Sequence, residues 1–109
     1  MRIPADAVIQ REKLTHYLLV PKPRNDKAGY LAQIGFTEHN PERLEAALRR
    51  LTDENEALLD REDEYGRFYR VEGDIQGPHG TLSTITIWIE QRVDGLFRFV
   101  TLKPARRRQ

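Results

Sequence analysis

The stretch GTLSTITIWIE, residues 80–90, places an isoleucine at every second position. Alternate side chains of a β-strand point to opposite faces, so Ile85, Ile87 and Ile89 predict a strand with one face in a core. Thr84, Thr86 and Trp88 are then expected on the other face. A chain with such a strand must supply partner strands at its edges and a layer that covers the isoleucines.

Partner strands are predicted on both sides of this stretch. Residues 67–75 alternate in the same way, with Tyr69, Val71 and Ile75 on one face. The sequence QGPHG that follows is typical of a turn. Asp94-Gly95 is a strong hairpin signal, and LFRFVTLK follows it as a further strand. The pattern predicts an antiparallel sheet over about residues 67–103.

The first half of the chain is predicted to be helical, over about residues 10–55. Its clearest helix has Asn40 as N-cap, Pro41 at the first helical position and an apolar stripe of leucines. A shorter helix, KAGYLAQIGF, is preceded by Asn25 and Asp26, either of which can cap it. The acidic segment DENEALLDREDEYG, residues 53–66, is expected to be a loop after Asn55, with a longer helix as the alternative.

These elements predict the α+β class, with two or three N-terminal helices packed on one face of a C-terminal three- to four-stranded antiparallel sheet. At 109 residues the chain is expected to be a single domain, residues 1–109, with a basic tail over 104–109. It contains no cysteine, which excludes disulfides and thiolate metal sites. The sequence shows no signal-peptide pattern and no apolar run of membrane-spanning length, so we expect a cytoplasmic protein without a membrane partner.

Charge is unevenly distributed although the net charge is only +1. Residues 1–36 and 76–109 are basic, whereas residues 37–75 are acidic. If the two basic ends meet in space, they form a positive face that attracts phosphate. The alternative is an ordinary solvated surface with a basic tail.

The register of the sheet predicts which side chains share its uncovered face. With Ile75 and Thr81 flanking the turn, Val71 is expected opposite Ile85, and Phe68 opposite Trp88. The uncovered face then holds Phe68, Arg70, Glu72, Thr84, Thr86, Trp88, Phe99 and Thr101. Two interpretations remain open for this face: a ligand or substrate surface, with Phe68, Thr84, Thr86, Trp88 and Thr101 as binding residues, or a solvated face or dimer contact.

No pattern of residues identifies a reaction by itself. His16, His39 and His79 lack metal-ligand spacing, and there is neither a phosphate-binding glycine loop nor a nucleophile elbow. We therefore predict no metal and no cofactor.

Three segments together resemble a family of small bacterial domains of uncharacterised function: IPADAVIQREKLTHYLL, DKAGYLAQIGF and DEYGRFYRVEGDIQGPHGTLSTITIWI. The resemblance covers nearly the whole chain. The matching residues are Ile3, Pro4, Ala5, Lys13, Leu14, Tyr17, Leu18, Leu19, Lys27, Ala28, Tyr65, Gly66, Tyr69, Gly77, Gly80 and Trp88. Such domains occur alone or at the C-termini of large secreted proteins, as in polymorphic toxins. Their order of helices and strands is similar to the barnase/EndoU/colicin/RelE-type ribonuclease fold, although fold alone does not fix function.

The resemblance implies a metal-independent ribonuclease. Such an enzyme needs a base for the 2′-hydroxyl, an acid for the leaving 5′-oxygen, and cations at the phosphate. Lys27 and Arg70 are the candidates for the phosphate, and Tyr65, His16 or His79 for proton transfer. The family's loop before the Lys-Ala helix commonly carries a histidine, whereas this chain reads PKPRNDKAG, which leaves the identity of the base open.

Two hypotheses follow from these observations. The first is a toxin-related ribonuclease-like domain that acts on RNA and has an antitoxin or immunity-like protein as partner. The second is a non-catalytic module that uses the uncovered sheet face for protein binding or for a homodimer.

Overall fold

A computed structural model of the chain describes residues 1–23 and 26–105. It has helices followed by a four-stranded antiparallel sheet, which confirms the α+β prediction. The strands are β1 (Leu58–Asp63), β2 (Gly66–Gly77), β3 (Gly80–Gln91) and β4 (Phe97–Pro104), and they lie in the order β1-β2-β3-β4. Residues 106–109 of the predicted basic tail lie outside the described residues, and Pro104 belongs to β4.

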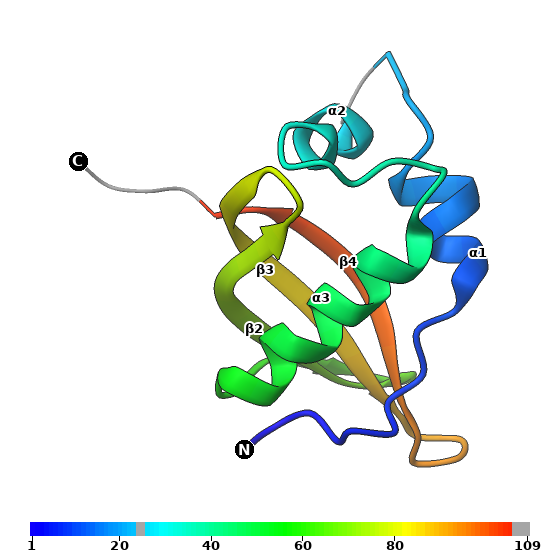
Figure 1. Ribbon diagram of the computed structural model, residues 1–109. Helices are drawn as coiled ribbons and strands as arrows, with labels where there is room; N and C mark the ends of the chain where they lie inside the picture. Colours follow the sequence, from blue (N-terminus) through cyan, green and yellow to red (C-terminus); the bar gives the residue numbers. More distant parts are fainter. Residues whose placement is uncertain (24–25, 106–109) are drawn as a thin grey trace.

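The helices pack on one face of this sheet. α1 (Arg11–Lys13) continues into a π-helical turn, η1 (Leu14–Leu18), and α2 (Lys27–Ala32) and α3 (Pro41–Glu54) follow. Asp26 caps α2, because its carboxylate accepts a hydrogen bond from the backbone N–H of Gly29 at 3.1 Å. Figure 1 shows α3 lying across the face of the sheet, with α1 on the side of β4.

α3 packs closely on β2 because the strand carries a glycine beneath the helix. A Cβ on Gly73 would lie 2.7 Å from Leu51 Cδ1 and 2.6 Å from the side-chain nitrogen of Asn55. The predicted leucine stripe of α3 is buried as expected, with Leu44, Leu48 and Leu51 at most 1% exposed.

The prediction of a loop after Asn55 is wrong for residues 58–63, which form the edge strand β1. Most of its residues are exposed, so no alternation of apolar and polar side chains marked it as a strand. Its pairing with β2 is irregular between Leu59 and Arg61, as expected for an edge strand.

The predicted register of the β2–β3 hairpin is wrong by one residue. The ladder continues to Gly77 opposite Gly80, which leaves a two-residue turn, and it places Val71 opposite Thr86 and Tyr69 opposite Trp88. A slip of one residue moves every side chain of a strand to the other face. The faces of β2 were therefore predicted correctly, whereas those of β3 are inverted.

The inverted strand supplies Thr84, Thr86 and Trp88 to the core. Thr84 and Thr86 are fully buried, and Trp88 is 1% exposed. Phe99, also predicted on the uncovered face, is 1% exposed and packs edge-on against Trp88 with ring centroids 5.2 Å apart.

Hydrogen bonds inside the core explain why threonines are tolerated there. Trp88 Nε1 donates to Thr86 Oγ1 at 2.9 Å, and that hydroxyl donates to the Val71 carbonyl at 3.0 Å. The Tyr30 hydroxyl lies 3.1 Å from Thr84 Oγ1. Among the described residues no buried side-chain nitrogen or oxygen lacks a partner, so this polar core has no unpaired groups to destabilise it.

The N-terminal segment covers part of the β4 edge. Val8 forms a parallel bridge with Arg98, in which its N–H donates to the Phe97 carbonyl and its carbonyl accepts from the Phe99 N–H, both at 2.8 Å. This bridge fixes the start of α1 beside β4, where the Lys13 ammonium reaches the Val100 carbonyl.

Candidate functional site

The face of the sheet turned away from α3, which we call the outer face, is the first candidate surface. The strand register places these residues on it: Leu58, Phe68, Arg70, Glu72, Ile85, Ile87, Ile89, Thr101 and Lys103. Ile85 and Ile87 are partly exposed, and Leu58 is 57% exposed. The isoleucines predicted for the core thus line the surface on which the ligand was expected.

Three of the five predicted substrate-binding residues are not on this surface. Thr84, Thr86 and Trp88 lie in the core, where their polar atoms already have partners. The prediction that Trp88 offers an exposed stacking platform is therefore wrong, because the register turns its ring toward the helices.

Phe68 is on the predicted face but is not open to solvent. It is only 8% exposed, because Ile89 lies opposite it and the Arg61 guanidinium covers its ring at 3.8 Å from the centroid. Arg61 is held in turn by Asp63 at 2.9 Å. A ligand would have to displace this cation from the ring before it could stack on Phe68.

Lys27 and Thr101 are brought together from opposite ends of the chain. The Lys27 ammonium donates to Thr101 Oγ1 at 2.7 Å, and it lies 5.5 Å from the centroid of the Tyr17 ring. The Lys22 ammonium lies 3.6 Å from the same centroid. Both lysines therefore contact neutral groups, which leave their positive charge uncompensated.

The remaining two lysines of the chain lie at the same part of the molecule. Lys13 Nζ donates to the Val100 carbonyl at 3.3 Å, and Lys103 follows Thr101 by two residues on the outer face of β4. We call Lys13, Lys22, Lys27 and Lys103 the lysine corner. In the part of the chain that the structure describes, none of the four forms an ion pair with a carboxylate.

Arg70 shares a row of the sheet with this corner. Ile87 pairs with Thr101 on one side and with Arg70 on the other, so two strand spacings, roughly 10 Å, separate Arg70 from Thr101. The Arg70 guanidinium is 3.6 Å from the Glu72 carboxylate. This ion pair is exposed and therefore weak, so a phosphate can take the place of the Glu72 carboxylate. A hollow of about 320 Å³ beside it is lined by Asn55, Glu56, Leu58, Arg70 and Glu72.

The three proton-transfer candidates lie in different places. His16 is exposed on η1, next in sequence to Tyr17, whose ring the two lysine ammonium groups approach. Tyr65 is 68% exposed in the β1–β2 turn, five residues from Arg70 and hence roughly 16 Å away along the strand. The structure thus does not bring Tyr65 to the row that contains Lys27, Thr101 and Arg70. His79 lies in the β2–β3 turn, where its N–H donates to the Ile34 carbonyl at 2.9 Å.

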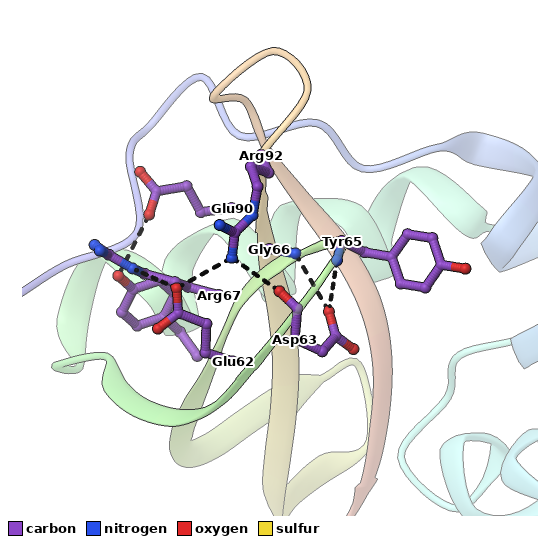
Figure 2. Close-up of polar contacts among 8 residues, drawn as sticks. Glu62, Asp63, Tyr65, Gly66, Arg67, Glu90 and Arg92 are labelled. Carbon is purple, nitrogen blue, oxygen red and sulfur yellow. Dashed lines mark hydrogen bonds and ion pairs between the residues drawn. The ribbon is translucent and has the colours of Figure 1, made fainter.

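Tyr65 adjoins a cluster of charges that stabilises its own turn (Figure 2). Arg92 donates to Glu62 at 3.2 Å and to the Asp63 carbonyl at 2.9 Å, and Arg67 lies 3.5 Å from the same Glu62 carboxylate. The Asp63 carboxylate accepts from the backbone N–H of Tyr65 at 2.8 Å. Figure 2 shows the Tyr65 ring pointing away from these charges.

These contacts shift the pKa values of Asp63 and Arg67. Desolvation, the largest single effect, raises the pKa of Asp63, but the Tyr65 and Gly66 backbone N–H groups and the Arg61 guanidinium together lower it below its ordinary value. The Tyr69 hydroxyl and the Glu62 carboxylate raise the pKa of Arg67. The cluster pairs its charges internally, which indicates a structural role for this turn.

Sequence reasoning missed the lysine corner as a unit, and it missed Tyr17 as its common neighbour. The uneven charge distribution was the available signal, since all four lysines lie in the two basic thirds of the chain. The Thr-x-Trp spacing was the corresponding signal for the buried face, because a buried indole N–H needs an acceptor and Thr86 lies two residues before Trp88 on the same face.

Residues 1–23 and 26–105 contain neither a cluster of metal ligands nor a membrane-spanning helix. No group of three or more His, Cys, Asp or Glu side chains is placed there to hold a metal ion. No helix there is long and apolar enough to cross a membrane.

Comparison with protein families places this chain. Residues 4–106 match the model of the family described as domain of unknown function DUF6883. The chain belongs to this family. Among curated proteins, none is significantly similar in sequence. The match of the DUF6883 model extends from the residue after Ile3 to beyond the end of β4, so it includes every element described above.

A solved structure shares the fold. It is a chain of the contact-dependent growth inhibition toxin–immunity protein complex from Klebsiella pneumoniae 342, with a TM-score of 0.67 and 21% sequence identity. The similarity covers 91% of this chain and 100% of that chain. At this level of identity the comparison establishes a common fold.

Proposed function

We propose that this DUF6883 domain is toxin-related and cleaves RNA at the outer face without a metal ion. The observation that carries the proposal is the lysine corner, where a hydrogen bond holds Lys27 against Thr101 and no carboxylate of the described residues forms an ion pair with it. A fold shared with a chain of a toxin–immunity protein complex supports the toxin-related part by analogy.

The proposed roles follow from position. Lys27 and Arg70 stabilise the negative charge that develops on the phosphate, from two sides of Ile87. His16, beside Tyr17, is the proposed group for proton transfer, because an imidazole has one nitrogen that can accept a proton and one that can donate it. Tyr65 is too far from this row for proton transfer, and its proposed role is contact with RNA that extends toward the β1–β2 turn.

The partners of such a domain follow from the same proposal. An immunity-like protein that blocks the outer face would keep the producing cell from damage, as the composition of the structural neighbour's complex suggests. The proposed place of action is the cytoplasm, where RNA substrates are abundant.

A cleavage assay tests the proposal. Purified protein is incubated with total tRNA and rRNA in EDTA, and the products are separated by denaturing electrophoresis. We expect fragments with the wild type, loss of cleavage by at least tenfold for Lys27→Gln and Arg70→Gln, and no change for Arg43→Gln. Arg43 is an exposed charge on α3 and serves as the matched control. Intact RNA after prolonged incubation with wild-type protein would refute the ribonuclease proposal.

A second function is supported by a different observation. Ile85 and Ile87 are partly exposed on the outer face beside the 57% exposed Leu58, an apolar surface that suits a protein partner or a second copy of the chain. In that case the domain is a non-catalytic binding or dimerisation module. Light scattering of the wild type and of Ile87→Glu tests the dimerisation form of this proposal, because a dimer held by this apolar surface should fall to the mass of a monomer on this substitution.

A further inference from the structure

The four lysines lie around one short length of β4, although three of them come from the first 27 residues of the chain. Lys13 reaches the carbonyl of Val100, and Lys27 reaches the side chain of Thr101. Lys103 lies on the same face as Thr101, two residues further along the strand, or about 7 Å at ~3.3 Å per residue. Lys13, Lys27 and Lys103 are therefore spread along the strand, and Lys22 joins Lys27 at the ring of Tyr17.

The arginines show the opposite arrangement. Seven of those described lie within 4.0 Å of a carboxylate: Arg49, Arg50, Arg61, Arg67, Arg70, Arg92 and Arg98. Lys13, Lys27 and Lys22 instead contact a carbonyl, a hydroxyl and an aromatic ring, respectively. These neutral partners orient the ammonium groups and leave their charge available to an anion.

The carboxylate nearest in sequence to Lys27 forms no ion pair with it among the described residues. Asp26 Oδ1 accepts the hydrogen bond from the Gly29 N–H, which holds it at the start of α2. The corner thus combines uncompensated positive charge with a spread over several residues of strand, which suits a chain of phosphates better than a single one.

We propose that the lysine corner is a phosphate track, along which Lys13, Lys22 and Lys103 hold the backbone of single-stranded RNA on either side of the phosphate held by Lys27. This inference rests on the proposed function in its choice of RNA, and it adds three binding residues outside the proposed cleavage machinery. Tyr17 positions Lys22 and Lys27, because its ring lies beside both ammonium groups.

The binding experiment uses RNA that cannot be cleaved. A fluorescently labelled 2′-O-methyl decanucleotide lacks the 2′-hydroxyl that the proposed cleavage needs, so its anisotropy reports binding alone. Binding is measured in EDTA between 50 and 300 mM KCl for the wild type, for Lys22→Gln/Lys103→Gln, and for the control Arg43→Gln/Arg50→Gln. Both double variants remove two positive charges, but the control charges are exposed on α3, across the opposite face of the sheet (Figure 1).

The salt dependence gives the expected magnitude. Each phosphate contact on a single strand contributes about 0.7 to the slope of log K against log salt. Loss of Lys22 and Lys103 should therefore lower the slope by about 1.4 and weaken binding at 0.15 M salt by roughly tenfold. The control should keep the wild-type slope to within about 0.3, well below the loss of a single phosphate contact. Thermal unfolding of both variants verifies that they are folded.

The outcomes separate this inference from the proposed function. Equal slopes for the two double variants, or wild-type protein that fails to bind the decanucleotide, would overturn the phosphate track. Specific loss of binding in Lys22→Gln/Lys103→Gln together with uncleaved natural RNA would support the track and overturn the ribonuclease proposal. An acidic protein that binds the corner while RNA does not would also overturn the track.

Discussion

Replacement of Thr86 by valine tests the inverted face of β3 most directly. Valine has nearly the same shape as threonine, so the substitution leaves no cavity but removes the hydroxyl. Trp88 Nε1 then loses its acceptor at 2.9 Å, and the Val71 carbonyl loses the hydroxyl that donates to it at 3.0 Å. Since Thr86 is fully buried and Trp88 is 1% exposed, water cannot replace the lost partner easily.

The expected cost is that of a buried donor left unsatisfied, about 1–3 kcal/mol. For a chain of this size, 1 kcal/mol corresponds to roughly 4 °C in the unfolding temperature, so the midpoint should fall by about 4–12 °C. The same substitution at exposed Thr81 should change the free energy of unfolding by less than about 0.5 kcal/mol. Urea denaturation and calorimetry measure both values.

A double-mutant cycle isolates the contact itself. Trp88→Phe removes the indole N–H, so Thr86→Val should cost about 1 kcal/mol less in that background than in the wild type. If Thr86→Val proves as harmless as Thr81→Val, or if its cost is the same in both backgrounds, the indole is not buried against Thr86 and the register of β3 with β2 differs from the one described above.

The remaining predictions concern charge on the two faces of the sheet and the effect of pH. Thr86→Asp should prevent folding, because it buries an unpaired carboxylate at a cost of several kcal/mol. Ile87→Asp should fold, since its side chain is partly exposed on the outer face near Thr101 and Arg70. Circular dichroism of both variants checks this prediction, and an unfolded Ile87→Asp with a folded Thr86→Asp would contradict it. The Leu96 backbone N–H and the Arg98 guanidinium lower the pKa of Asp94, so its contribution to stability is present above the ordinary carboxyl pKa and disappears as pH falls through the lower folded value. Asp94→Asn should thus be less stable than the wild type at pH 7, and the difference should disappear as pH falls below the folded pKa of Asp94. Thermal unfolding over the acid range measures it, and a difference that persists undiminished in acid would show that the carboxylate charge is not the cause.

The sequence by itself determined the class of the fold and most of its elements. Asn40 and Pro41 define the start of α3, and the leucine stripe defines its buried face, because both signals act within a few residues of the chain. The alternation in 67–75 likewise gave the correct faces of β2, whose Tyr69, Val71 and Ile75 are buried. Lys27, Arg70 and Thr101 were also selected from the sequence, and the structure places them in or beside one row of the outer face.

Only the tertiary structure decided which face of β3 is buried. The alternation of isoleucine with threonine and tryptophan is compatible with either face, and the choice depends on a turn of two residues at Pro78-His79 that sets the register with β2. The buried threonines are stabilised by partners far away in the sequence: Val71 lies opposite Thr86, and Tyr30 reaches Thr84 from α2. The lysine corner has the same origin, since the bridge between Val8 and Arg98 and the packing of the helices bring Lys13, Lys22 and Lys27 to β4. Such long-range contacts have no local signature in the chain, because they arise only when its two ends fold against each other.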